Sequence, residues 1–119
     1  MKKLLILTAV FLITLSAYAQ DKKELVLNQE TNLIEAKIYH DNGVVAQTGF
    51  YTAKGVVHGT WVSFDAQGVK TAVANYNQGK KVGTWFQWKK NTVRQINYEN
   101  NAIASVSDWK EETKLAANK

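Results

Sequence analysis

Three tryptophans, Trp61, Trp85 and Trp109, recur every 24 residues, and the first two belong to the same tripeptide, Gly-Thr-Trp. A fixed period between about 20 and 50 residues is typical of a chain that copies one supersecondary unit, each copy burying a face on its neighbour. A wider set of glycine and aromatic residues follows the repeat: Gly43, Tyr51, Gly59, Trp61, Phe64, Gly68, Tyr76, Gly83, Trp85, Trp88 and Trp109. The chain is therefore predicted to be a repeat protein.

The segments between the turn residues have the composition of strands. Runs rich in β-branched and aromatic residues, bounded by glycine, asparagine and aspartate, predict hairpins. The expected strands are 33–39, 44–51, 59–64, 69–76, 83–88 and 93–98. Asn42-Gly43 predicts a type I′ turn, because both positions tolerate positive φ. The predicted fold is all-β, an antiparallel meander of about three β-hairpin repeats over residues 33–109.

The N-terminal segment has the grammar of a secretory signal. Lys2 and Lys3 precede a 12-residue apolar run, Leu4 to Leu15, and small residues follow at Ala17 and Ala19. Spanning a membrane takes about 20 apolar residues, so the run is short for an anchor. We expect a cleaved signal peptide over 1–19, an exported (periplasmic or secreted) mature chain and no membrane span after cleavage.

The two flanks of the repeat region are less regular. Residues 20–32 form a polar lead-in segment that is either a short strand or a mobile arm. At the other end, residues 107–117 have helix-forming composition, and Asp108 followed by Glu111 suits a helix N-terminus. The last repeat is expected to decay into a short C-terminal helix that caps the sheet edge, with Trp109 still docked and residues 110–119 serving as a cap or tail.

Composition narrows the partner classes. The mature chain, residues 20–119, is enough for one small domain. It has no cysteine, so neither disulfides nor thiolate metal sites are expected. Loss of Lys2 and Lys3 lowers the formal net charge from +5 to +3. Such a charge is compatible with an anionic envelope component but is a weak footprint for nucleic acid.

The repeated hairpins, with Gly-x-Trp-x-x-aromatic and a turn glycine four residues later, resemble the MORN repeat in its bacterial variant form. The resemblance covers about residues 33 to 109 and is carried by residues 59–64 with Gly68 and by residues 83–88. In the last copy Thr92 replaces the glycine and Ser107-Asp108-Trp109 replaces Gly-Thr-Trp. The resemblance implies a twisted single-layer sheet that scaffolds proteins or lipids, and related bacterial modules include proposed antitoxins.

Few residues suggest catalysis. His40, Asp41 and His58 are the candidates for an enzyme, but both histidines are expected to be solvated loop residues, and a site needs convergent ligands and an orienting shell. Similar short exported proteins carry the label of nicotinic acid mononucleotide adenylyltransferase. Such an enzyme needs a paired-histidine phosphate motif on an α/β sheet, which this sequence does not predict. We expect no catalytic residues, no metal site and no cofactor.

Binding residues are sought among the aromatic and basic side chains. Residues three apart on a strand face opposite sides, so Trp61 and Phe64 are expected on opposite faces. The tryptophans are either core ladders that hold a thin sheet together or a presented row. Lysines at the ends of the Trp85 strand are either solvated or a patch for anionic lipid or polysaccharide. The candidate binding residues are Trp61, Trp85, Trp88, Lys80, Lys81, Lys89 and Lys90.

The sequence favours an exported, non-enzymatic binding or scaffolding module with an unknown protein or an anionic envelope component as its partner. One alternative is an inhibitor or antitoxin-type immunity protein. A second is a small-substrate enzyme, which requires the two histidines to converge with a carboxylate.

Overall fold

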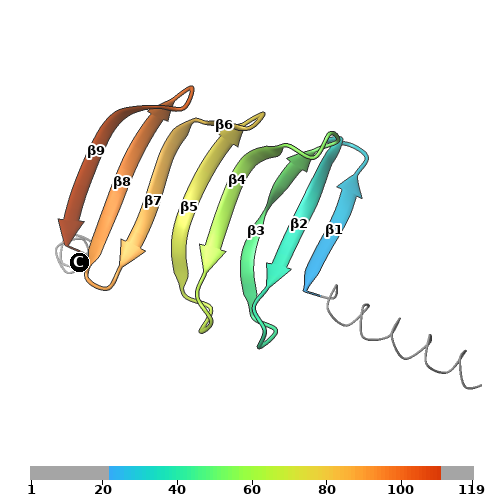
Figure 1. The fold of residues 1–119 in the computed structure, drawn as a ribbon, viewed down its shortest axis with the longest axis horizontal. Coiled ribbons are helices and arrows are strands. Elements are labelled where there is room, and N and C mark those ends of the chain that lie inside the picture. The colour runs from blue at the N-terminus through green and yellow to red at the C-terminus, as the bar shows by residue number, and fades with distance from the viewer. Residues whose placement is uncertain (1–21, 111–119) are drawn as a thin grey trace, which may run out of the picture.

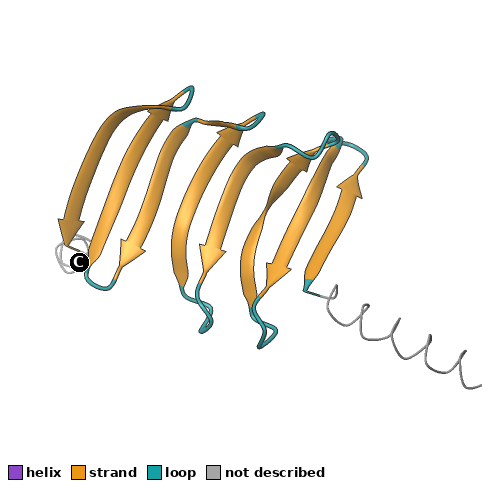
Figure 2. Ribbon diagram, viewed as in Figure 1, coloured by secondary structure: helices purple, strands orange, loops and turns teal. Residues whose placement is uncertain are grey.

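The computed structural model describes residues 22–110, and these residues form one antiparallel sheet (Figure 1). Every regular element in this range is a strand (Figure 2). The strands are β1 (Lys23–Asn28), β2 (Leu33–Tyr39), β3 (Val45–Thr52), β4 (Val57–Phe64), β5 (Lys70–Asn77), β6 (Lys80–Lys81), β7 (Gly83–Lys89), β8 (Thr92–Glu99) and β9 (Ala102–Lys110).

The sheet is a meander, as the sequence predicts. Its strand order is β1-β2-β3-β4-β5-β7-β8-β9, and the two-residue β6 pairs with β5 beside this path. All pairings are antiparallel between neighbours in the path. The expected all-β antiparallel meander is confirmed.

The prediction of a C-terminal helix is wrong for residues 107–110, the part of it that the structure describes. Residues 107–110 belong to β9, and Asp108 and Trp109 lie opposite Arg94 and Val93 on β8. Pairing with β8 satisfies backbone groups that would otherwise form an open edge, and this tertiary contact overrides local helix propensity. The rest of the predicted helix, residues 111–117, lies outside the described residues, as does the predicted signal peptide.

The polar lead-in segment is a strand rather than an arm. Residues Lys23–Asn28 form β1 and pair along their whole length with β2. Leu25 and Leu27 alternate on this strand, opposite Ala36 and Ile34. The sheet therefore begins ten residues before the predicted first strand at Leu33.

One face of the sheet, which we name the tryptophan face, carries a cross-strand row of apolar residues. Following the strand pairs, and the contact of Gly49 with the Trp61 ring, the row from β1 to β9 contains Leu25, Ala36, Gly49, Trp61, Ala74, Trp85, Ile96 and Val106. Trp61 is on this face and Phe64 is on the other, as their three-residue spacing predicts. Trp85 and Trp88 are divided in the same way.

The opposite face, which we name the ladder face, is more polar. One of its rows contains Thr48, Val62, Val73, Phe86, Gln95 and Ser107. A second row contains Thr60, Asn75, Thr84, Asn97 and Ser105. With no second layer in the described residues, the buried apolar side chains are few: Ala36, Trp61, Val93 and Ile96.

The Asn42-Gly43 turn differs from the predicted type I′ form, which needs positive φ at both positions. Gly43 alone is left-handed, with φ of +87°, and its N–H donates to the His40 carbonyl. The Asn42 side chain explains the difference, since it accepts the Val44 N–H and donates to the Ala66 carbonyl. Two consecutive positive φ values occur instead at Gln78-Gly79 and Asn100-Asn101.

Candidate binding surfaces

Trp61 is packed into the sheet rather than presented. Its indole lies directly over Gly49, where a Cβ atom would approach the ring to 2.0 Å. The indole Nε1–H donates to the Phe50 carbonyl over 3.1 Å, and the residue is only 6% exposed. Glycine at position 49 therefore lets a tryptophan be buried in a sheet that has one layer.

Trp85 repeats this arrangement less completely. Its Nε1–H donates to the Asn75 carbonyl over 3.0 Å and contacts the Val82 carbonyl at 3.2 Å. The carbonyls of Phe50 and Asn75 accept equivalent bonds from the two indoles. The residues before them, Gly49 and Ala74, therefore occupy equivalent positions in the two hairpins. Ala74 carries a methyl group where Gly49 carries none, and Trp85 is half-buried whereas Trp61 is buried.

Tyrosines pack against each of the two tryptophans and form two aromatic clusters. Tyr51 meets Trp61 edge to face, with ring centroids 5.1 Å apart, and Tyr76 meets Trp85 at 5.1 Å. Tyr98 contacts the other side of Trp85 at 4.9 Å. Burial raises the pKa of Tyr76, and the neighbouring Tyr98 adds to this effect. Such pairs stabilise a fold beyond their buried area, so the aromatic residues of the tryptophan face have a structural role.

Trp109 does not share the face of the other two repeat tryptophans. It lies opposite Val93, which also faces Trp88, so Trp88 and Trp109 flank Val93 on the ladder face. Val93 is fully buried, and Trp88 stacks on Phe86 with centroids 5.7 Å apart. The sequence period of 24 residues therefore describes two different sites.

The four candidate lysines form two separate pairs rather than one patch. Lys80 and Lys81 are in β6, at one end of β7, whereas Lys89 and Lys90 are at the other end. A seven-residue strand is about 20 Å long. Lys81 lies over aromatic rings, with Nζ 5.4 Å from the Trp85 centroid and 5.3 Å from that of Tyr98. Lys80, Lys89 and Lys90 are exposed.

A hydrogen-bonded polar ladder is a feature that the sequence reasoning missed. Thr60 Oγ1 donates to Asn75 Oδ1 over 2.7 Å, and Thr84 Oγ1 donates to Asn97 Oδ1 over 2.8 Å. Asn97 Nδ2 then donates to Ser105 Oγ over 2.7 Å. A sequence pattern that could have indicated this polar ladder is the recurrence of threonine in both Gly-Thr-Trp tripeptides and of Asn-Tyr at 75–76 and 97–98.

The two histidines do not converge. His40 follows β2 and its Nε2 lies 2.8 Å from the Phe64 carbonyl oxygen, which accepts a bond from it. His58 is in β4 at the opposite end of the strands, where its Nδ1 accepts the Gln78 N–H over 3.0 Å. Asp41 pairs with Lys22, whose hydrogen bond and charge lower the Asp41 pKa. Within residues 22–110, no group of three His, Cys, Asp or Glu side chains is placed to hold a metal.

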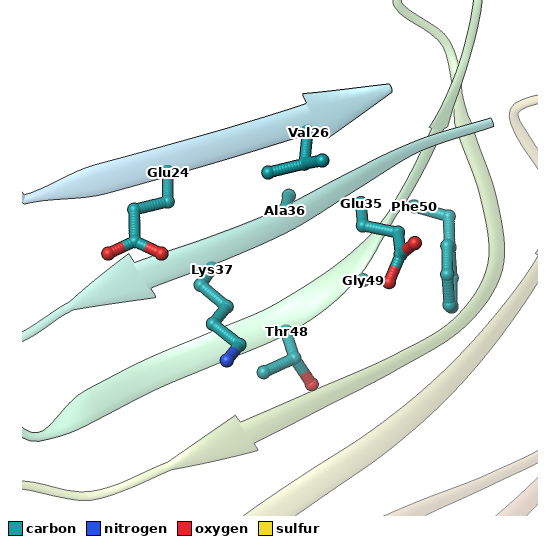
Figure 3. A pocket seen from close by; sticks show the side chains of 8 residues that line it. All are labelled: Glu24, Val26, Glu35, Ala36, Lys37, Thr48, Gly49 and Phe50. Atoms are coloured by element: carbon teal, nitrogen blue, oxygen red, sulfur yellow. The ribbon is translucent and has the colours of Figure 1, made fainter. Parts of the chain in front are cut away.

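A shallow hollow of about 300 Å³ lies on the ladder face over β1, β2 and β3. Figure 3 shows Lys37 extending toward Thr48 and the Glu35 carboxylate beside the Phe50 ring. The other lining residues are Glu24, Val26, Ala36 and Gly49. Ala36 and Gly49 lie on the strands beneath the hollow, and their side-chain positions belong to the tryptophan face. The sequence reasoning missed it, since neither glutamate follows the repeat.

Comparison with protein-family models, with curated proteins and with solved structures found no match. The MORN resemblance therefore depends on the quoted residues alone. In the described part of the chain, no helix is long and apolar enough to cross a membrane.

Proposed function

We propose that the chain is an exported, non-enzymatic module that binds or scaffolds another protein and is built from about three MORN-like hairpins. One observation carries the proposal: a one-layer sheet leaves aromatic side chains half-exposed on both of its broad faces. Tyr51, Tyr76, Trp85 and Tyr98 lie on the tryptophan face, and Phe50, Phe86, Trp88 and Trp109 lie on the ladder face. Aromatic residues are enriched in protein–protein interfaces.

The tryptophan face is the better docking surface of the two. Its apolar row continues across every strand of the path, whereas the ladder face is interrupted by the threonine and asparagine row. A partner that covers this apolar row buries apolar area, which costs less than covering the threonine and asparagine row of the ladder face.

Two matched substitutions test the proposal. Ser63→Glu adds a carboxylate to the tryptophan face, and Ser107→Glu adds the same group to the ladder face. The parent and both variants are immobilised and exposed to envelope extract and culture medium, and the captured proteins are quantified. We expect one stoichiometric partner, lost with Ser63→Glu and kept with Ser107→Glu, because an unpaired charge is costly in an interface. Equal capture by both variants contradicts the face assignment, and no specific capture contradicts the proposed function.

Two alternatives are separated by simple assays. An inhibitor or immunity protein requires that the captured partner be toxic on its own and neutralised by the chain. An adenylyltransferase releases pyrophosphate from ATP and nicotinate mononucleotide. Activity that survives purification and is lost in His40→Ala or His58→Ala replaces the binding proposal with an enzyme.

An anionic envelope component is a second candidate partner. It is favoured by Lys81, whose ammonium group lies over Trp85 and Tyr98 and forms a basic and aromatic corner. Co-sedimentation with anionic vesicles at low salt, fading near 0.15 M where the Debye length is about 8 Å, is the expected behaviour. Lys81→Gln reduces this binding and Lys90→Gln, at the other end of the sheet, does not. Binding that neither variant changes removes this candidate.

A further inference from the structure

The two outer strands of the sheet run in opposite directions. The path contains eight strands, all paired antiparallel, so β1 and β9 point opposite ways (Figure 1). A second copy shifted along the sheet beyond β9 would therefore bring its β1 alongside β9 in antiparallel orientation. The meander alternation continues across such a contact without a break.

The backbone groups that these strands direct away from the sheet are in matching positions. The Tyr39 N–H donates to the Lys22 carbonyl, so Lys22 and every second residue after it direct their backbone groups toward β2. Lys23 and Leu25, which alternate with them, direct their backbone N–H and C=O groups outward. Thr92 on β8 and Lys89 on β7 are the paired residues that flank a two-residue turn, so the backbone N–H and C=O groups of Thr92 point toward β7. The backbone groups of Arg94 and Ile96 point the same way, because the pattern repeats every second residue. Their β9 partners, Lys110, Asp108 and Val106, then direct their backbone groups outward.

Apolar side chains are exposed at both ends of the tryptophan face. Leu25 and Leu27 on β1 are each 52% exposed, and Val106 and Ile103 on β9 are 51% and 59% exposed. Leu25 and Val106 are the two end members of the same cross-strand row. A contact that places them opposite each other extends the row and covers side chains that the isolated chain leaves in water.

Charge selects the register. With Val106 opposite Leu25 of the next copy, antiparallel counting places Asp108 opposite Lys23, and opposite charges facing across strands stabilise a pair. Sliding by two residues, so that Val106 faces Leu27, places Lys110 opposite Lys23, and two like charges then face each other. Direction, backbone groups and the apolar row favour antiparallel pairing of β9 with β1, and charge favours the first of these two registers.

We infer that copies of this chain associate head to tail, with β9 of one copy pairing with β1 of the next, Val106 opposite Leu25 and Asp108 opposite Lys23. The contact joins two different surfaces, so it propagates into rings or filaments rather than stopping at a dimer. This inference does not depend on the proposed binding function, because it uses the edges of the sheet and not its faces.

Proline substitutions test the polarity of the contact. Leu25→Pro and Val106→Pro each remove an outward N–H and are compatible with an edge strand. In sedimentation velocity of the full chain as recovered from cells, the parent is expected to form a concentration-dependent series of oligomers. Each variant alone is expected to be monomeric. An equimolar mixture should form a dimer and nothing larger, because Val106→Pro supplies β1 and Leu25→Pro supplies β9.

Other outcomes contradict the inference. Val106→Pro that self-associates indicates contact between two β1 edges, and Leu25→Pro that self-associates indicates contact between two β9 edges. Oligomers that neither substitution affects indicate association through a face. A parent chain that stays monomeric throughout overturns the inference directly.

Charge reversal supplies a test that removes no backbone donor. Asp108→Lys and Lys23→Asp each create like charges at the contact, and each is expected to weaken association about fivefold or more. Mixing the two variants restores opposite charges at every contact and should restore assembly to near the parent level. Circular dichroism of each variant verifies its folding. Failure of the mixture to recover assembly contradicts the proposed register.

Discussion

The two Gly-Thr-Trp strands, β4 and β7, differ from β9 in where their tryptophans lie. Residues 65–69 connect β4 to β5 and residues 78–82, including β6, connect β5 to β7, whereas only residues 90–91 connect β7 to β8 and only Asn100 and Asn101 connect β8 to β9. The row after Ile96 therefore continues at Val106, three residues before Trp109. An offset of three changes the face of a strand. An identical spacing in sequence thus gives equivalent sites only if the connections have equivalent lengths.

The largest expected effect separates Trp61 from Trp109. Trp61→Ala removes a buried ring and should lower the free energy of unfolding by about 3 to 5 kcal/mol, a large part of the 5 to 15 kcal/mol typical of a domain. Trp109 is half-buried on the terminal strand, so Trp109→Ala should cost about 1 to 2 kcal/mol. Urea denaturation of both variants measures the difference. Equal costs would contradict the distinction between the two sites.

The next effect concerns the glycine beneath Trp61. Gly49→Ala places a methyl group against the indole and should cost about 1 to 3 kcal/mol through overpacking. In the Trp61→Ala background the same substitution should cost much less, because the obstructing ring is absent. Gly43→Ala is the control: no atom lies within 4 Å, and only its positive φ opposes the change. A double-mutant cycle with no coupling would show that Gly49 does not seat the ring.

A smaller effect is expected from the polar ladder. Thr84→Val keeps the shape of the side chain, loses the bond to Asn97 and should cost about 1 kcal/mol. Thr60→Val loses the equivalent bond to Asn75 but is exposed, so water replaces the partner more readily. Thermal denaturation compares the two variants. A larger loss for Thr60→Val would contradict this ranking.

The smallest effect is the acid dependence of the terminal strand. The hydrogen bond from Arg94, with its charge, lowers the Asp108 pKa below the ordinary value of 3.8. The folded state thus binds the proton less tightly than the unfolded state, so the pair stabilises above pH 3.8 and its contribution is lost as pH falls through the folded pKa. Asp108→Asn should slightly flatten the decline in stability between about pH 4 and pH 2. Both groups are half-exposed, so solvent screening keeps the change small. If Asp108→Asn leaves the pH dependence of stability unchanged in this range, the Arg94–Asp108 pair does not contribute to it.

The sequence predicts the strands well where turn glycines bound them, as for the predicted 83–88 and the observed Gly83–Lys89. It misplaces Trp109, because strand faces depend on bulges and on turn lengths that no single residue encodes. β9 is missed for another reason: its helix propensity is overridden by the edge of β8. The sequence predicts the lysines at strand ends. It does not predict the contact of Lys81 with two rings, because that contact depends on the pairing of Lys81 with Tyr76 on β5.

A sheet with one layer has a consequence for how it opens. Within residues 22–110, the main contacts of every strand are with its neighbours in the sheet, and no element of this range connects the two ends. Its energetics then approximate a one-dimensional nearest-neighbour chain, as in solenoid proteins. Such a chain frays from its termini inward, strand by strand, and its amides in β4, β5 and β7 exchange hydrogen last. Joining the ends of successive copies would remove the fraying points, so that an edge contact would also slow exchange throughout the sheet.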